Sequence, residues 1–320
     1  MTRFDAFNGD ADGLCALHQL RLANPAEAIL VTGVKRDIAL LARVAAAAEP
    51  GDAVTVLDVS LEVNRAPLET LLARGVDIAY FDHHYAGEIP HHPLLDAHID
   101  PAPDVCTSIV VDRHLGGAHR VWAIVGAFGD NLNGPAEGFA AELGLAPAAT
   151  AALKTLGENL GYNAYGDSEA DLVIPPADLY RLLSAYADPW RFIADEPVLE
   201  KIDDARRSDM SLAEDTEPAL AVAGGTLYVL PDEPWTRRVR GAFGNELANR
   251  HPHLAHAIVT ANAEGGYMIS VRAPLAAPHG ADALCRAFPS GGGRAAAAGV
   301  NNLPQADLPA FFRAFAQAYP

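Results

Sequence analysis

The sequence predicts an α/β protein: an N-terminal parallel-sheet domain with helices on both faces, joined by a linker to a smaller α/β C-terminal domain. Short β-like runs alternate with helical ones over the first 81 residues, and strands separated by single helices imply right-handed crossovers and parallel pairing. The composition, 50% hydrophobic and 20% charged, is typical of a soluble α/β protein. At about 150 residues per domain, the 320 residues suffice for two domains.

The alternation places individual elements along the first half of the chain. Strands are expected at 4–7, 29–34, 54–59 and 77–81, and helices at 12–23, 38–47 and 64–74. From Thr107 to about Tyr186 the pattern is mostly helical, with prolines marking breaks between helices.

The second half begins after a polar, charge-rich segment. Residues 191–217 are typical of a linker or an exposed connecting helix. We therefore expect one domain over residues 1–190 and another over 218–320. The latter should contain a strand at 226–230, a helix at 238–250, a hairpin of 257–261 and 267–272, and helices at 282–288 and 307–318 around a glycine-rich turn.

The charge balance restricts the partners. Lys and Arg number 23 against 41 Asp and Glu, which gives a formal charge of −18. Such a chain repels nucleic-acid backbones and anionic membranes unless it builds a local positive site. We therefore expect no binding to long double-stranded nucleic acid or to membranes, whereas a short phosphorylated ligand held by metals is compatible.

The ends and the cysteines indicate a compartment. No apolar run approaches the roughly 20 residues of a membrane span, and the N-terminus Met1–Asp5 does not resemble a secretory signal. Cys15, Cys106 and Cys285 are scattered and fit neither a zinc site nor a disulfide framework. These features predict a cytoplasmic protein with reduced thiols.

Acidic and imidazole side chains follow four predicted elements. They lie in Asn8–Gly13, at Asp58, in Asp82–His84 and in Gly129–Asn131. In an open parallel sheet, ligands bind beyond the carboxyl ends of the strands. Carboxylates with imidazole suit Mn²⁺, Fe²⁺ or Mg²⁺, and two such ions about 4 Å apart can clamp a phosphate and activate water.

Each of these pieces also has an ordinary explanation. Asp58 can cap the helix that follows it, and His83 and His84 can be loop histidines. Asp130 can start a turn with Asn131. The metal-site interpretation rests on all four segments falling on one edge of the predicted sheet.

At these residues the sequence resembles the DHH phosphoesterase superfamily, which is named for the triplet Asp82-His83-His84. Asn8–Gly13 looks like its first motif, Asp58 its second and Gly129–Asn131 its fourth. Ser290–Gly299 looks like the glycine-rich signature of the DHH-associated substrate domain. This pairing is similar to the oligoribonuclease (nanoRNase) and RecJ-like branch and differs from the pyrophosphatase branch.

The resemblance implies a centre of two divalent ions, with Mn²⁺ expected first and Mg²⁺ or Fe²⁺ as alternatives. Asp58 would bridge the ions. Asp10 would hold one of them, and Asp12, His83 and Asp130 would hold the other.

The resemblance also implies catalytic and substrate-binding groups. His84 would contact the scissile phosphate or polarise its leaving oxygen, and Asp82 would orient an imidazole. The substrate would be held by Arg272, in a Ser-x-Arg strand motif, and by Arg294. The backbone N–H groups of the glycine-rich turn would join them at Gly291, Gly292 and Gly293.

Two positions depart from the family pattern. The histidine that relatives carry four residues before the first aspartate is Ala6 here, so one metal site is poorer in ligands, although the Asn8 carbonyl can substitute in part. The histidine that follows the three glycines in the signature is Arg294 here, and arginine grips phosphate bidentately.

The sequence thus predicts a metal-dependent phosphoesterase of short nucleotides: very short RNA, a linear dinucleotide or a phosphorylated mononucleotide. The domains would act as catalytic (1–190) and substrate-binding (218–320) parts, and the interpretation allows a homodimer. Two alternatives stay open. A RecJ-like single-strand exonuclease needs a basic groove with aromatics, and a nucleotide-binding sensor with a degenerate metal site is suggested by Ala6.

Overall fold

The computed structural model describes residues 1–320, which form two compact units, Met1–Asp203 and Asp204–Pro320. The boundary lies within helix α10 (Val198–Glu214), which follows α9 (Pro189–Asp195). These helices occupy most of the polar segment 191–217. None of the helices combines the length and the apolar character that a bilayer crossing requires.

The N-terminal unit is built on five parallel strands in the order β2-β1-β3-β4-β5. Their bounds are β1 Arg3–Phe7, β2 Ile29–Val31, β3 Ala53–Leu57, β4 Asp77–Asp82 and β5 Leu95–Ile99. The parallel sheet and its first four strands confirm the predicted fold class. β5 was not predicted, because this short edge strand carries Asp96 and His98 and does not have the apolar pattern of a buried strand.

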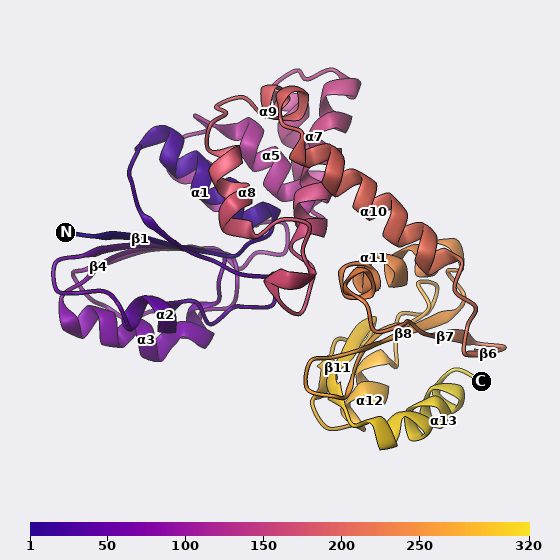
Figure 1. Cartoon of the computed structure of the whole chain (residues 1–320). Helices are drawn as coiled ribbons and strands as arrows, with labels where there is room; N and C mark the ends of the chain where they lie inside the picture. The colour runs from indigo at the N-terminus through magenta and orange to yellow at the C-terminus, as the bar shows by residue number, and fades with distance from the viewer. The chain divides into compact units, whose positions relative to one another are not determined.

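Helices cover both faces of this sheet. α2 (Leu41–Ala45) and α3 (Leu61–Arg74) lie on one face, and α1 (Ala11–Ala23) lies on the other (Figure 1). The remaining helices of the unit are α4 Thr107–His114, α5 Arg120–Gly129, α6 Asn133–Glu142, α7 Pro147–Asn163 and α8 Pro176–Leu183. Under α2 and α3, a core of buried side chains from β1, β3 and β4 includes Ala6, which is fully buried.

The direction of the strand order reverses between the paired strands β1 and β3. The chain leaves β1 toward β2 on one side, and later continues through β3, β4 and β5 on the other. Ligands of open α/β sheets bind beyond the carboxyl ends of the strands at such a reversal. Asn8–Asp12 follows β1 and Asp58 follows β3.

Close helix packing brings a third segment to this edge. A Cβ on Gly129, at the end of α5, would lie 2.2 Å from the Cβ of Ala11 in α1. A Cβ on Gly157 in α7 would lie 2.4 Å from the carbonyl oxygen of Val125. Only glycine permits these approaches, and they set the end of α5, followed by Asp130, against the start of α1.

The C-terminal unit contains a six-stranded sheet in the order β10-β11-β9-β8-β7-β6. Only β7 and β8 pair in parallel, and β8 and β9 form the predicted antiparallel hairpin. Helix α11 packs on one face of the sheet, whereas α12 and α13 pack on the other. The bounds are β6 Leu220–Val222, β7 Gly225–Val229, α11 Pro234–Arg250, β8 Ala255–Ala261, β9 Tyr267–Arg272, α12 Ala281–Arg286, β10 Gly291–Gly293, β11 Ala297–Leu303 and α13 Leu308–Ala318.

The predicted glycine-rich turn near a helix start is wrong: Gly291–Gly293 is strand β10, and the alanine run leads into strand β11. Close approach explains why low strand propensity is overridden here. A Cβ on Gly291 would lie 1.8 Å from the carbonyl oxygen of Cys285, and one on Gly299 would lie 2.7 Å from that of Ile269. Bare backbone is needed at Gly291 for β10 to fit against α12, and at Gly299 for β11 to fit against β9.

A buried histidine in the N-terminal unit predicts acid sensitivity. The Nε2 of His18 lies 2.8 Å from the Tyr186 carbonyl oxygen, its ring packs edge-on against Trp122, and its buried Nδ1 has no hydrogen-bond partner. Burial lowers the pKa of His18 from 6.5 to about 4. The unfolded chain therefore binds this proton first, so the stability that neutral His18 contributes is present above pH 6.5 and is lost as the pH falls toward 4.

We expect acidification from pH 7 to pH 5 to remove about 2 kcal/mol of unfolding free energy through this one group. His18→Phe, which cannot take up a proton, should lose correspondingly less over the same interval. Urea unfolding of both proteins at the two pH values measures the difference. Equal losses in both would contradict the assignment.

Candidate metal centre

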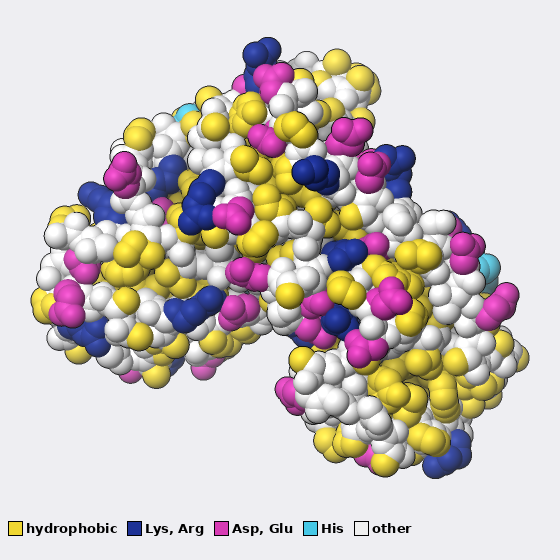
Figure 2. All heavy atoms as spheres, viewed as in Figure 1, with side chains coloured by type: hydrophobic (Ala, Val, Ile, Leu, Met, Phe, Trp, Pro, Cys, Tyr) yellow, Lys and Arg dark blue, Asp and Glu magenta, His cyan; other side chains and the backbone are white.

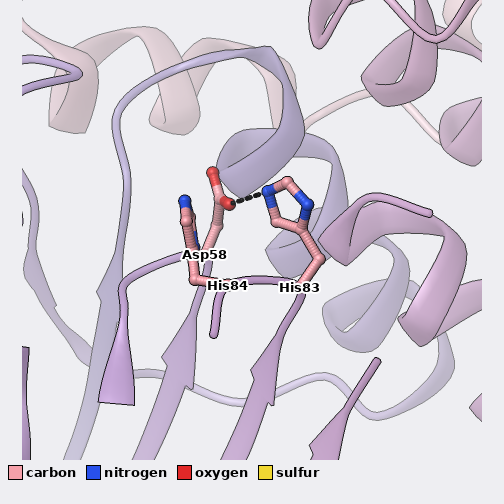
Figure 3. A group of neighbouring side chains, drawn as sticks. All are labelled: Asp58, His83 and His84. Carbon is pink, nitrogen blue, oxygen red and sulfur yellow. Dashed lines mark ion pairs between the residues drawn. The ribbon is translucent and has the colours of Figure 1, made fainter. Parts of the chain in front are cut away.

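Carboxylates and imidazoles from four segments converge at the carboxyl edge of the N-terminal sheet. Two groups bring their ligand atoms within 4.8 Å of one another: Asp12, His83 and Asp130 form one, and Asp58, His83 and His84 form the other. Figure 3 shows the second group, with Asp58 between the two imidazoles. The sequence predicted this convergence.

Asp10 and the start of α1 are one structural unit. Asp10 is the N-cap of the helix, and its Oδ1 accepts hydrogen bonds from the backbone N–H groups of Asp12 (3.0 Å) and Gly13 (3.1 Å). These donors have no partner within the helix, so a carboxylate cap stabilises the first turn. The other oxygen, Oδ2, lies 2.6 Å from Nζ of Lys35.

Asp12 connects two helices. Its Oδ2 accepts from the backbone N–H of Thr107 and its Oδ1 from that of Ser108, each at 2.7 Å. These are the first two residues of α4, so the carboxylate of α1 caps α4. Only 1% of Asp12 is exposed, and its carboxylate is fixed by folding before any ligand binds.

Asp58 holds an unusual backbone conformation directly after β3. Its φ is +58°, a left-handed value that costs a residue other than glycine about 1–3 kcal/mol and that clusters at functional sites. The N-cap position of the helix that follows is Ser60, so Asp58 is not its cap. Burial and the neighbouring Asp10 and Asp12 carboxylates raise the pKa of Asp58 well above its usual value. Such mutual repulsion favours a cation among these groups.

His83 faces the carboxylates through one nitrogen. Its Nδ1 lies 3.0 Å from the carbonyl oxygen of Val105, which can only accept, so Nδ1 carries the proton. Nε2 then lies 3.5 Å from Asp58 Oδ1 (Figure 3) and 3.8 Å from Asp130 Oδ2. Burial lowers the pKa of His83, but the Asp58 hydrogen bond and the charges of Asp12, Asp58 and Asp130 raise it to about 10.

Asp130 follows α5 and completes the first group. Burial and the charge of Asp12 raise its pKa to about 6, against the opposing effect of Lys35. The next residue, Asn131, has a φ of +62°, which ends the helix abruptly. Asp130 therefore lies at the end of α5, beside the other residues of the group.

His84 is paired with the fully buried Asp82. Its Nδ1 lies 2.7 Å from Asp82 Oδ1, and the other carboxylate oxygen, Oδ2, is buried without a partner. The carboxylate fixes the imidazole orientation, as the resemblance implies for Asp82. Because 41% of the His84 side chain is exposed, its Nε2 is accessible to a ligand.

Lys35 is the residue of this centre that the sequence analysis missed. Its Nζ lies 2.6 Å from Asp10 Oδ2 and 3.4 Å from Asp130 Oδ1. It lies in the loop after β2, at the same sheet edge as the other groups. Its position after β2 was the available signal, but a lysine ammonium is not a metal ligand and so is not part of a metal-binding pattern.

The donor set fits a hard divalent ion. Asp12, His83 and Asp130 supply carboxylate oxygens and an imidazole nitrogen, as Mn²⁺ and Fe²⁺ prefer. Asp58 lies next to this group, because its Oδ1 is 3.5 Å from Nε2 of His83. Both groups depend on the same His83 Nε2, and one imidazole nitrogen ligates one ion, so a second ion must rely on Asp58, His84 or Asp10.

Comparison with known proteins then identifies the fold. No family model and no curated protein matches the sequence, but solved structures do. The exonuclease RecJ bound to manganese superposes with a TM-score of 0.66 at 19% identity, over 100% of this chain and 91% of that chain. A pGpG-specific phosphodiesterase, PggH from Vibrio cholerae, gives 0.57 at 14% identity, over 99% and 98%. The chain has the DHH phosphoesterase fold.

The same DHH fold is found in RecJ from Thermus thermophilus in complex with Mn²⁺, with a TM-score of 0.64 and 19% identity. All of this chain is covered, but only 52% of that longer chain. The DHH fold confirms the architecture that the motifs implied, while the ligand assignments remain predictions from the geometry.

In the C-terminal unit of this DHH fold, Arg272 ends β9. Its Nε donates to Asn245 Oδ1 (2.7 Å) and its Nη1 to Ser270 Oγ (3.0 Å). Arg294 lies exposed in the connection from β10 to β11, where its backbone N–H donates to the carbonyl oxygen of Ala297. Both predicted arginines are therefore on the same sheet, because β11 pairs with β9.

Arg240 was not predicted as a site residue. It projects from α11, and its Nη1 donates to Thr260 Oγ1 of β8 at 2.6 Å. α11 packs over β8 and β9, so Arg240 and Arg272 belong to the same face of the sheet. Their shared face is visible only once the helix is placed.

Proposed function

We propose that the chain is a metal-dependent phosphoesterase that hydrolyses short nucleotides, such as a linear dinucleotide, very short RNA or a phosphorylated mononucleotide. The observation that carries this is the convergence of Asp12, Asp58, His83 and Asp130 at the β1/β3 edge. The fold shared with a manganese-bound exonuclease and a pGpG phosphodiesterase supports it.

A divalent ion at this centre supplies the positive charge that activates water and stabilises a phosphoryl transition state. Backbone groups of the chain hold the ligating side chains in position before the ion binds. Asp12 and His83 are held by backbone groups of Thr107, Ser108 and Val105. The donor atoms are thus positioned by folding, which reduces the cost of reorganisation on binding.

We assign proton donation to His84. Its Nδ1 is held by Asp82, so its exposed Nε2 can donate to the oxygen that leaves the phosphate. The buried carboxylate fixes the direction of the imidazole ring. The same arrangement allows His84 to bind a phosphate oxygen through the Nε2 proton.

We assign substrate-phosphate binding to arginines of the C-terminal unit. Arg272 and Arg240 are each oriented by hydrogen bonds, to Asn245 and Ser270 and to Thr260. Arginines fixed in this way bind phosphate with less loss of side-chain entropy than free ones. We assign the exposed Arg294 to a terminal phosphate of the substrate. The backbone N–H groups of Gly291–Gly293, which precede Arg294 in the chain, are assigned to the same part of the substrate.

On the face shown in Figure 2, the Lys and Arg side chains are separated by acidic and hydrophobic ones. Together with the formal charge of −18, this favours a short substrate over a long backbone. The TM-score of 0.66 to RecJ favours a single-strand exonuclease as the second candidate. The Lys35–Asp10 pair and Ala6 favour a sensor as the third.

One experiment separates the three candidates. The metal-stripped protein is supplied with Mn²⁺ and a panel of dinucleotides, 3′-phosphorylated AMP, and RNA and single-stranded DNA of increasing length, and the products are resolved by chromatography. We expect mononucleotides or nucleosides from the shortest substrates and slower turnover with length. Processive degradation of long strands would favour the exonuclease, and binding without turnover at any divalent metal would favour the sensor.

Arg272→Ala tests the assignment of the C-terminal unit. Loss of a charge-assisted pair with phosphate should raise KM about 10- to 100-fold and leave bound Mn²⁺ unchanged. Arg313→Ala, which removes an exposed arginine of α13, is the matched control. Steady-state kinetics on a dinucleotide measure the effect, and an unchanged KM in Arg272→Ala would return this residue to a structural role.

A further inference from the structure

The ammonium group of Lys35 occupies the acidic centre itself. Its Nζ contacts Asp10 at 2.6 Å and Asp130 at 3.4 Å, and 31% of its side chain is exposed. The two carboxylates come from different segments, after β1 and after α5. Lys35 therefore bridges the two sides of the centre, as a divalent cation would.

The backbone of Lys35 is anchored on both sides. Its N–H donates to the carbonyl oxygen of Ala164 (2.9 Å), and its carbonyl accepts from Nδ2 of Asn8 (3.1 Å). Nζ also lies 5.8 Å from the centre of the Tyr165 ring, within the range of a cation–π interaction. These contacts hold the side chain against the centre.

Asp10 already pairs with a cation, the ammonium group of Lys35. Asp10 Oδ1 caps α1, and Oδ2 pairs with Lys35. The Oδ1 atom of Asn8 accepts from the backbone N–H of Asp10 at 3.3 Å. The side chain of Ala6 offers no ligand and is packed in the core. Neither group of converging ligands includes Asp10.

We propose that Lys35 supplies the second cation of the centre, so that each chain binds one divalent ion tightly, through Asp12, His83 and Asp130. This inference rests on the proposed function and concerns how its charge is supplied. The ammonium neutralises Asp10. It also has a third N–H group that can donate to a phosphate oxygen of the substrate. The opposing charge of Asp10 also raises the pKa of Lys35 well above its usual value, against the effect of burial.

The test is the stoichiometry of Mn²⁺ on the full chain, which needs no substrate. The protein is stripped with chelator and titrated with Mn²⁺ while the free ion is followed by electron paramagnetic resonance. Lys35→Met removes the charge at similar side-chain length, and Lys35→Arg keeps it. Lys201→Met, at an exposed position of α10, is the matched control.

We expect wild type, Lys35→Arg and Lys201→Met to bind one Mn²⁺ per chain tightly. Lys35→Met should bind a second ion at least tenfold more tightly than wild type does, with the spectrum of two coupled ions. Two tight, coupled ions in wild type would overturn the inference, even if a variant failed to fold. So would a second-site affinity that is the same in wild type and in folded Lys35→Met.

The outcomes also distinguish this inference from the proposed function. Two ions in wild type with dinucleotide hydrolysis would remove the role of Lys35 and leave the phosphoesterase intact. No bound Mn²⁺ in any of the proteins would remove both. One ion with hydrolysis, and a second in Lys35→Met, would support both.

Discussion

Asp58→Asn is expected to lower phosphate-ester hydrolysis roughly a thousandfold or more. Asp58 is 3% exposed and lies within reach of His83 and Thr107 at the centre. The amide has nearly the same shape and tolerates the left-handed backbone, so the fold should survive. What is lost is a negative charge that neutral groups cannot replace in binding a divalent cation.

The same variant should be more stable than wild type in the absence of metal. Burial together with Asp10 and Asp12 disfavours the ionised Asp58 carboxylate, and the amide removes that repulsion. Thermal melting in chelator should therefore occur at a higher temperature for Asp58→Asn, and added Mn²⁺ should stabilise it less than it stabilises wild type. Asp77→Asn, at an exposed aspartate that begins β4, should change neither activity nor melting. Wild-type activity in Asp58→Asn would refute its placement in the centre.

His84→Ala is expected to lower kcat by about 10² to 10⁴, the usual contribution of a general acid, without loss of bound Mn²⁺. Asp82→Asn should have a smaller effect, about 10- to 100-fold, because it acts by orienting His84. Kinetics and metal content are measured on the same preparations. The matched control is His91→Ala, an exposed histidine in the connection between β4 and β5.

The metal content decides between two roles of His84. It belongs to the second group of converging ligands, with Asp58 and His83. If His84→Ala lost Mn²⁺ along with activity, the residue would be a metal ligand and the proton-donor assignment would fall. An unchanged kcat would exclude both roles.

Much of this centre was predictable because parallel strands deliver their carboxyl ends to one edge. Asp10, Asp58 and His83 each follow a strand that the apolar pattern had located, so their convergence followed from the fold class. Their roles as ligands stay predictions. The mutual arrangement was not predictable in detail: the backbone N–H groups of Thr107 and Ser108 donate to the carboxylate of Asp12, a contact that no sequence pattern indicates.

Features that depend on close tertiary approach were missed. β10 and β11 consist largely of glycine and alanine, which local propensity does not assign to strands. The close approach of the backbone of Cys285 to Gly291, and of Ile269 to Gly299, explains why these residues form strands. Lys35 and Arg240 were missed for a related reason, since a single cation has no pattern until the groups that it faces are placed.

The carboxylate of Asp12 couples ligand binding at the centre to helix α4. Both of its oxygens accept from the first residues of α4, so a ligand drawing on this carboxylate also acts on that helix. The exchange of the Thr107 and Ser108 amide hydrogens with solvent deuterium should therefore change when a ligand occupies the site. Substitutions that destabilise the start of α4 should in turn lower the affinity of the centre for its ligand, although they change none of the side chains that bind the ligand.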